Sequence, residues 1–274
     1  MGIEISCGLA AVQPASLSDQ LTILGLPKEL LEEIFIRLDL KSLCVMCPRV
    51  CRQWYEVLQD RKFWLQLCLR QGLMLPSKLE RQNSNGPIDY KKMCIQQIRF
   101  NGRNLIRNPN GELGQLFWHM QFGGDGWQVE SPPIGVDSDF QCCFASSFQL
   151  CAKEQTINLE IEGIEGWIVD LLRPKISVSE YHSARRDCGA VYCLSAELLD
   201  LNDSVLVRAE KTYHTETGEG HAWNTAVIEF IDYPRGVRQI RHASRGRDSL
   251  FWAGHYGAKM TQACVMVVFE KSKV

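Results

Sequence analysis

The sequence has no apolar run long enough to span a bilayer, and the first residues, 1–6, lack the positive flank of a secretory signal. It also has little net charge, -2, from 30 basic and 32 acidic residues among 274. A chain so close to neutral does not attract nucleic acid through bulk electrostatics. These absences favour a cytoplasmic protein that has no nucleic-acid partner.

Cofactor and catalytic patterns are missing as well. The 6 histidines are dispersed, and none lies in an H-E-x-x-H pattern. The glycine-rich segment 123–126 is followed by Trp127 and an expected strand, not by a helix, so it predicts a tight turn instead of a phosphate-binding loop. We therefore expect no metal, no cofactor and no catalytic residue.

The 12 cysteines are scattered and, without a secretory signal, are expected to be reduced thiols. Cys44, Cys47 and Cys51 have a spacing that could suggest a metal, but they fall at core positions of expected helices. Cys142 and Cys143 are adjacent in an expected strand, where their side chains point to opposite faces. A cysteine nucleophile that acts with a distant histidine stays an alternative.

Residues 1–20 are expected to form a flexible tail that contains one short motif. Met1-Gly2-x-x-x-Ser6 followed by Cys7 fits N-myristoylation at Gly2, with Cys7 available for palmitoylation. Two such lipids would give stable anchoring, whereas one gives only marginal membrane binding. Because the motif is short, a chance match is the alternative, and lipid-mediated membrane association stays a hypothesis.

Residues 21–70 predict a small helical domain. Apolar residues at helical spacing, opposite a charged face, are Leu30, Leu31, Ile34, Phe35 and Leu38, and Pro27 suits the first helical turn. Two shorter helices are expected, at 40–46 and from Pro48 to about Leu58. Three short helices bury too little surface to be stable alone, so part of this apolar surface should face a partner.

The detailed pattern in this stretch resembles the F-box. It reads L-P-x-E-L-L-x-x-I-F-x-x-L from Leu26, and then C-x-x-V-C-x-x-W from Cys47. The resemblance implies docking on the S-phase kinase-associated adaptor, and through it on the cullin scaffold, of an SCF-type E3 ubiquitin ligase. The residues that it implies as adaptor contacts are Leu26, Pro27, Leu30, Leu31, Ile34, Phe35 and Trp54.

Residues 71–100 are expected to be a linker, with a turn at 83–87 and a helix that Asp89 caps and that runs to about Arg99. From residue 101 onward, short alternating runs predict strands, for example at 157–162, 192–198, 205–210 and 226–231. Helices do not alternate with these strands, as a parallel sheet would require. The predicted fold class is therefore α+β multidomain, ending in an antiparallel β-sandwich, or jelly roll, of roughly ten strands.

Several segments of residues 101–274 resemble the F-box-associated domain: 102–109, 123–127, 144–148, 232–238 and 251–258. The match is to F-box only proteins, whose members include recognisers of N-linked glycans. It implies a β-sandwich whose loops grip the inner chitobiose of high-mannose glycans on misfolded glycoproteins, which are then ubiquitinated in ER-associated degradation. The implied sugar contacts are Phe148, Phe251 and Trp252.

Residue chemistry agrees with such a site, because two adjacent large aromatics in a turn-like loop cannot easily both enter a core. The chain also departs from the family pattern. Phe251 stands where a tyrosine is frequent and Ala253 where one member has lysine, so two hydrogen-bonding groups are lost. Residues 162–170, 180–181 and 261–264 also differ. We expect modest glycan binding; the alternatives are an F-box adaptor whose sandwich binds a protein surface, and a thiol-dependent enzyme.

Overall fold

The computed structural model describes residues 25–82, 86–137 and 139–270. The candidate lipidation residues Gly2 and Cys7 lie outside these ranges. The chain forms two compact units, residues 1–63 and 64–274, which are described separately.

The first unit is helical. It contains α1 (Lys28–Phe35), a π-helical turn η2 (Ser42–Met46), a 3-10 turn η3 (Cys47–Arg49) and α2 (Arg52–Gln59). Its core is built around Phe35, whose ring meets Trp54 edge-on at a centroid distance of 5.0 Å and Phe63 at 6.2 Å. The helix expected from Pro48 to Leu58 is interrupted, because the backbone of Cys51 is extended between η3 and α2.

Helix α3 (Arg61–Arg70) straddles the boundary between the units, and the second unit continues with α4 (Lys78–Gln82) and α5 (Tyr90–Phe100). Asp89 caps α5 as predicted, since its carboxylate accepts the N–H of Lys92 at 3.0 Å. The amide of Gln97 on α5 bonds both the N–H and the C=O of Met74, each at 2.8 Å. These two hydrogen bonds join the segment before α4 to α5.

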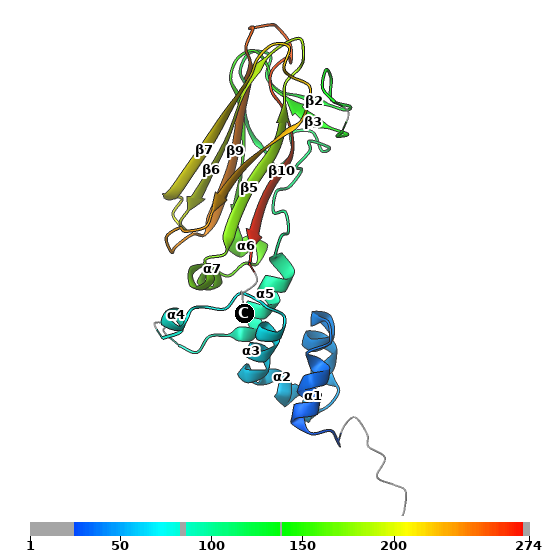
Figure 1. Cartoon of the computed structure of the whole chain (residues 1–274), viewed down its shortest axis with the longest axis vertical. Coiled ribbons are helices and arrows are strands. Elements are labelled where there is room, and N and C mark those ends of the chain that lie inside the picture. The colour runs from blue at the N-terminus through cyan, green and yellow to red at the C-terminus, as the bar shows by residue number, and fades with distance from the viewer. Residues whose placement is uncertain (1–24, 83–85, 138, 271–274) are drawn as a thin grey trace, which may run out of the picture. The chain divides into compact units, whose positions relative to one another are not determined.

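Ten strands then form two five-stranded antiparallel sheets, which confirms the predicted sandwich (Figure 1). The first sheet has the order β1 (His119–Gln121), β4 (Cys151–Asn158), β9 (Gln239–Asp248), β6 (Ala190–Leu199) and β7 (Val205–Thr215). The second has the order β2 (Gln128–Glu130), β3 (Cys143–Ala145), β10 (Lys259–Val268), β5 (Lys175–Ser183) and β8 (Asn224–Phe230).

The strand expected to continue through Glu162 ends earlier, at Asn158. The side chain of Asn158 accepts the N–H groups of Glu160 and Ile161 at 3.0 and 3.1 Å, and this cap starts α6 (Leu159–Glu162). Helix α7 (Gly166–Leu172) follows. The prediction of a strand over 157–162 was therefore wrong beyond Asn158, because the side chain of Asn158 caps a helix there.

The interior of the sandwich contains charged groups that join the two sheets. Lys153 of β4 and Glu180 of β5 are fully buried and 2.5 Å apart, and the hydroxyl of Tyr192 on β6 donates to Glu180 at 2.7 Å. Burial pulls the pKa of Glu180 upward, but the Lys153 ammonium and the hydrogen bonds outweigh it and hold this pKa below its ordinary value. Removing one partner of such a pair typically costs about 3–5 kcal/mol.

Two buried histidines lie beside this pair. His182 stacks on Tyr192 with ring centroids 4.3 Å apart, and His242 meets Trp118 edge-on at 5.5 Å. Burial lowers the pKa of each histidine to about 4. Both histidines are therefore neutral in the native chain at pH 7.

Acidification should destabilise the protein well above pH 4. Between pH 6.5 and 4 the unfolded chain binds protons on His182 and His242 that the folded chain does not bind, so stability falls as pH falls through this range. At pH 5 the loss should be roughly 2 kcal/mol per histidine. Urea denaturation at pH 7.5 and 5.0 measures it. His242→Phe keeps a ring beside Trp118 and should show a shallower pH dependence; an equally steep dependence would contradict this assignment.

Candidate functional site

Three loops gather at one end of the sandwich: 122–127 between β1 and β2, 146–150 between β3 and β4, and 249–258 between β9 and β10 (Figure 1). The strand register brings them together, because Ala145 pairs with Lys259 and Cys151 pairs with Gly246. Helices α6 and α7 lie at the opposite end of the strands (Figure 1). Phe148, Phe251 and Trp252, the predicted sugar contacts, all lie in these loops.

Asp248, the last residue of β9, fixes the loop that contains the aromatic pair. Its carboxylate is fully buried and accepts three backbone N–H groups, from Leu250 at 3.1 Å, Phe251 at 2.7 Å and Trp252 at 3.0 Å. Phe251 has a φ of 56°, a left-handed conformation that a bulky residue rarely adopts. The three charge-assisted bonds offset this strain and determine where the two rings point.

Both aromatic rings reach solvent. Phe251 is 65% exposed and Trp252 is 43% exposed, although the sequence predicted only that one of them would face outward. The ring of Trp252 meets Tyr256 edge-on at 5.5 Å, and the guanidinium of Arg185 lies 4.3 Å from the Tyr256 ring centre. Tyr256 therefore contacts the ring of Trp252 and is itself held by a cation–π contact.

The three loops are also bonded to one another. The N–H of Gly254 donates to the carboxylate of Asp125 at 2.6 Å, and the hydroxyl of Ser147 donates to the carbonyl of Gly254 at 2.8 Å. The N–H of Asp125 donates to the same Ser147 oxygen at 3.0 Å. These bonds leave little freedom for the loops to move apart.

The half-buried ring of Phe148 packs directly against Gly124. Gly124 has a φ of 59°, and a Cβ at this position would stand 2.8 Å from the Phe148 ring. Only glycine allows this close approach in this backbone conformation. Phe148 is thereby placed within the same set of bonded loops as the exposed aromatic pair.

Such an arrangement suits a ligand that has apolar faces and a polar edge. The aromatic rings offer flat apolar surfaces, and the loops are rigid, so little ordering entropy is lost on binding. The supporting residues Asp248, Asp125, Ser147 and Tyr256 were not identified from the sequence. The one available signal was an aspartate three and four residues before the members of an aromatic pair, a spacing that allows its side chain to cap a turn.

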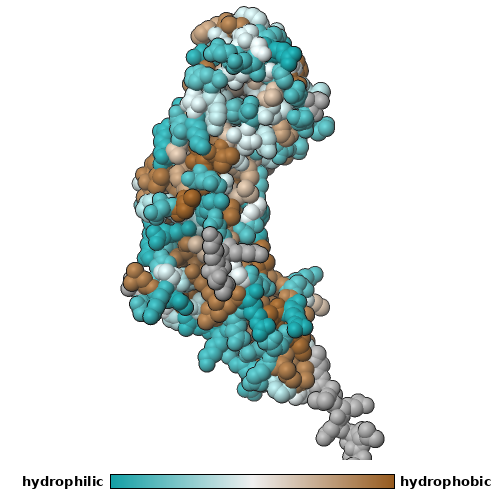
Figure 2. Space-filling view, in the orientation of Figure 1, coloured by the Kyte–Doolittle hydropathy of each residue, from teal (hydrophilic) through white to brown (hydrophobic). Residues whose placement is uncertain are grey.

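The first unit exposes a second set of functional candidates (Figure 2). Its exposed large apolar residues are Leu30, Ile34, Val45, Met46, Val50 and Tyr55, with Leu30 at 52% and Met46 at 60%. The seven predicted adaptor contacts divide between surface and core. Leu30, Ile34 and Pro27 are exposed and Leu26 and Trp54 are half-buried, whereas Leu31 and Phe35 are fully buried. Leu31 and Phe35 therefore hold the unit together and do not face a partner.

Most of the cysteine thiols in the described ranges are buried. Burial raises the pKa of Cys143, Cys188 and Cys264, so these thiols form thiolate less readily than a free cysteine. Within residues 25–270, apart from the four that are not described, no cluster of His, Cys, Asp or Glu is placed to bind a metal ion. In the same part of the chain, no helix has both the length and the apolarity to cross a membrane.

Comparison with known proteins identifies both units. The F-box-like family matches residues 23–70, and the F-box associated region matches residues 97–267. Human F-box only protein 6 is 33% identical over 250 residues, which cover 88% of this chain and 83% of that protein. F-box only protein 2 of Bos taurus is 34% identical over 255 residues, which cover 88% and 82%.

Solved structures resemble the sandwich more distantly. TmCBM61, solved in complex with β-1,4-galactotriose, is 12% identical, with a TM-score of 0.42, and the match covers 61% of this chain and 99% of that chain. The family matches, by contrast, span most of the sequence and include both units. The chain therefore belongs to the F-box only proteins that combine an F-box with an F-box associated region.

Proposed function

We propose that this chain is the substrate-recognition subunit of an SCF-type cullin–RING E3 ubiquitin ligase and that it binds N-glycosylated proteins. Its first unit binds the S-phase kinase-associated adaptor, and the loop end of its sandwich binds the chitobiose core of high-mannose glycans. The chain has no catalytic role and needs no cofactor of its own. The observation that carries this proposal is the exposed aromatic pair, Phe251 and Trp252, fixed by the buried Asp248.

The ligase end is supported by apolar surface that the first unit does not cover by itself. Leu30 and Ile34 lie one turn apart on α1, and Val45, Met46 and Val50 are exposed on the turns that follow. Exposed apolar residues so close together in a small unit mark a protein interface. The F-box match explains which partner this surface would fit.

The glycan end is supported by ring geometry. A sugar presents C–H faces that pack on aromatic rings and hydroxyls that need polar partners. Exposed rings on bonded loops supply the first requirement. Because Phe251 and Ala253 lack the hydroxyl and the ammonium found in relatives, binding would depend mainly on stacking and would be modest.

A second candidate is an F-box adaptor whose loop end binds a protein surface. Phe122, Leu150 and Leu250 are exposed in or beside the same loops as the aromatic pair, and they would suit an apolar peptide. The thiol-dependent enzyme has weaker support, because burial raises the pKa of several thiols and so reduces their nucleophilicity.

Substrates of this kind would be misfolded glycoproteins returned to the cytosol for ER-associated degradation, so the proposed location is the cytoplasm. Gly2 and Cys7 remain candidate lipidation residues. If they are lipidated, the protein would work at a membrane surface.

Leu30→Glu combined with Met46→Glu should abolish co-purification with the adaptor while leaving the unit folded. Both side chains are more than half exposed, so the charges face water in the free chain but would be buried in the complex. Leu79→Glu, at a 66% exposed leucine of α4, is the matched control and should retain the adaptor. Undiminished adaptor recovery with the double variant would refute the proposed interface.

Trp252→Ala and Phe148→Ala should each weaken retention on a column that carries chitobiose-bearing glycoprotein. Loss of one aromatic contact should cost about 1–3 kcal/mol, which corresponds to roughly 5- to 150-fold in affinity. Trp167→Ala, which removes a half-buried tryptophan from α7 at the opposite end, is the control. If the wild-type chain is not retained at all, the protein-binding candidate replaces glycan recognition.

A further inference from the structure

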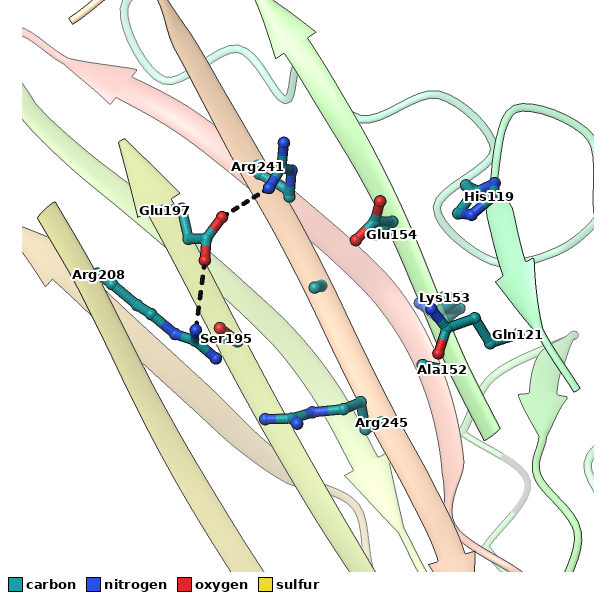
Figure 3. Close-up of a pocket in the computed structure, with 11 residues that line it drawn as sticks. His119, Gln121, Ala152, Lys153, Glu154, Ser195, Glu197, Arg208, Arg241 and Arg245 are labelled. Atoms are coloured by element: carbon teal, nitrogen blue, oxygen red, sulfur yellow. Dashed lines mark hydrogen bonds and ion pairs between the residues drawn. The ribbon is translucent and has the colours of Figure 1, made fainter. Parts of the chain in front are cut away.

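The outer face of the first sheet has a hollow of about 220 Å³, here called the sheet hollow (Figure 3). Its floor contains the small side chains of Ser195 on β6 and Ala243 on β9, which pair with each other across the two strands. Arg241 and Arg245 flank Ala243 along β9, and Glu154 pairs with Ala243 from the other side. The surface is hollow here because the short side chains of Ser195 and Ala243 lie between the long side chains of Arg241, Arg245 and Glu154.

The arginines around the sheet hollow are held by carboxylates. Glu197 accepts from Arg241 at 2.8 Å and lies 3.6 Å from Arg208 (Figure 3). Glu210 lies 2.5 Å from Arg245 and 3.2 Å from Arg208. Lys153 also lines the sheet hollow, and its ammonium is paired with the buried Glu180. With Glu154, four carboxylates therefore balance the four cationic side chains. The region is therefore rich in fixed donors and acceptors but has no excess positive charge to select an anion.

Several polar groups in the sheet hollow have no partner of their own. The hydroxyl of Ser195 points into it from a residue that is only 6% exposed, and it makes no side-chain hydrogen bond within the described residues (Figure 3). The side chains of Glu154, His119 and Gln121 line the facing wall, and among residues 25–270 as described they also have no bonded side-chain partner. A nearly buried hydroxyl without a partner gains a hydrogen bond when a polar ligand enters.

The lining determines the class of ligand. It includes donors, acceptors and groups that are both, but no Phe, Tyr or Trp. Each of its four cationic side chains, those of Lys153, Arg208, Arg241 and Arg245, is paired with a carboxylate. Sugar hydroxyls, which donate and accept at the same oxygen, match this chemistry, whereas a phosphate would need uncompensated cations. The volume is below the roughly 300–1,000 Å³ of sites for whole small ligands, so it suits one residue of a longer saccharide.

A row of arginines connects the sheet hollow to the aromatic loop. Arg241, Arg245 and Arg247 share one face of β9 because side chains alternate along a strand. The guanidinium of Arg247 lies 5.7 Å from the ring centre of Phe251. From Ala243 to Asp248 the strand advances about 17 Å, at roughly 3.3 Å per residue. That distance is a few sugar units, so one branched glycan can reach both places.

We propose that the sheet hollow is a second saccharide-binding subsite, which takes an uncharged, hydroxyl-rich arm of the glycan whose core lies at Phe251 and Trp252. The location of the core rests on the proposed function, whereas the chemistry of the arm rests on the lining of the sheet hollow. The subsite adds affinity for extended glycans over the bare chitobiose and explains how modest stacking at the loops would suffice.

NMR titration of the full-length chain tests this with α-mannotriose, which lacks chitobiose. The amide signals of Ser195, Ala243 and Arg245 should shift saturably. Ser195→Ala removes the unpartnered hydroxyl, and Ala243→Leu fills the sheet hollow, so both should suppress these shifts. Thr212→Leu, at an exposed residue of β7 outside the lining, should preserve them.

A five-mannose glycan with chitobiose should bind the wild type about 3- to 10-fold tighter than chitobiose alone, and Ala243→Leu should remove that gain.

Absence of these shifts with mannotriose, or equal shifts in Ala243→Leu, would overturn the subsite. Stronger perturbation of the same amides by inorganic phosphate would also overturn it, in favour of an anion site. Titration with chitobiose tests the loop site separately, because binding there should shift the amide signals of Phe251 and Trp252. If only mannotriose binds, the loop assignment fails and the subsite stands; if only chitobiose binds, the subsite fails and the proposed function stands.

Discussion

The buried carboxylate of Asp248 is the contact on which the proposed recognition end depends. It accepts three backbone N–H groups of the aromatic loop, while the N–H of the same residue donates to the carbonyl of Ser147 at 3.1 Å. One residue at the end of β9 therefore fixes two of the three loops. It also holds Phe251 in its left-handed conformation, which turns both aromatic rings outward. Without this carboxylate, three N–H groups of the aromatic loop would lose their partner, and the orientation of the two rings would no longer be fixed.

The sandwich is rigid enough to support this loop because buried ion pairs lie near and below it. Lys259, the first residue of β10, contacts Glu130 of β2 at 2.5 Å and donates to the carbonyl of His255 at 3.1 Å. It thus joins a strand end directly to the aromatic loop. Deeper in the interior, Lys153 and Glu180 join one sheet to the other. Burying such a pair costs desolvation free energy. Once the pair has formed, however, few alternative packings of the two sheets satisfy both charges, and we regard this specificity as its contribution here.

The sequence predicted the class of fold because alternating runs and turn residues are local signals. For the same reason it predicted that one of the two adjacent aromatics would face outward, since two large rings in a short loop cannot easily both be buried; it did not predict that both would. It failed at Asn158, where a side-chain cap turned an alternating run into α6, and it could not separate the buried Leu31 and Phe35 from the exposed Leu30 and Ile34. The sheet hollow could not be predicted from the sequence. Glu154, Ser195 and Ala243 are neighbours only through the register of three strands, which sequence does not determine.

In the proposed function, exposed apolar residues of the small helical unit bind a ligase, and the loops at one end of the sandwich bind a glycan. The most direct test is reconstituted ubiquitination of a denatured high-mannose glycoprotein by the chain assembled with its adaptor and the cullin scaffold. The same polypeptide, after endoglycosidase removal of the glycan, is the comparison. The account predicts ubiquitin transfer to the glycosylated form and little to the deglycosylated one. Equal transfer to both forms would contradict glycan recognition as the function of this sandwich.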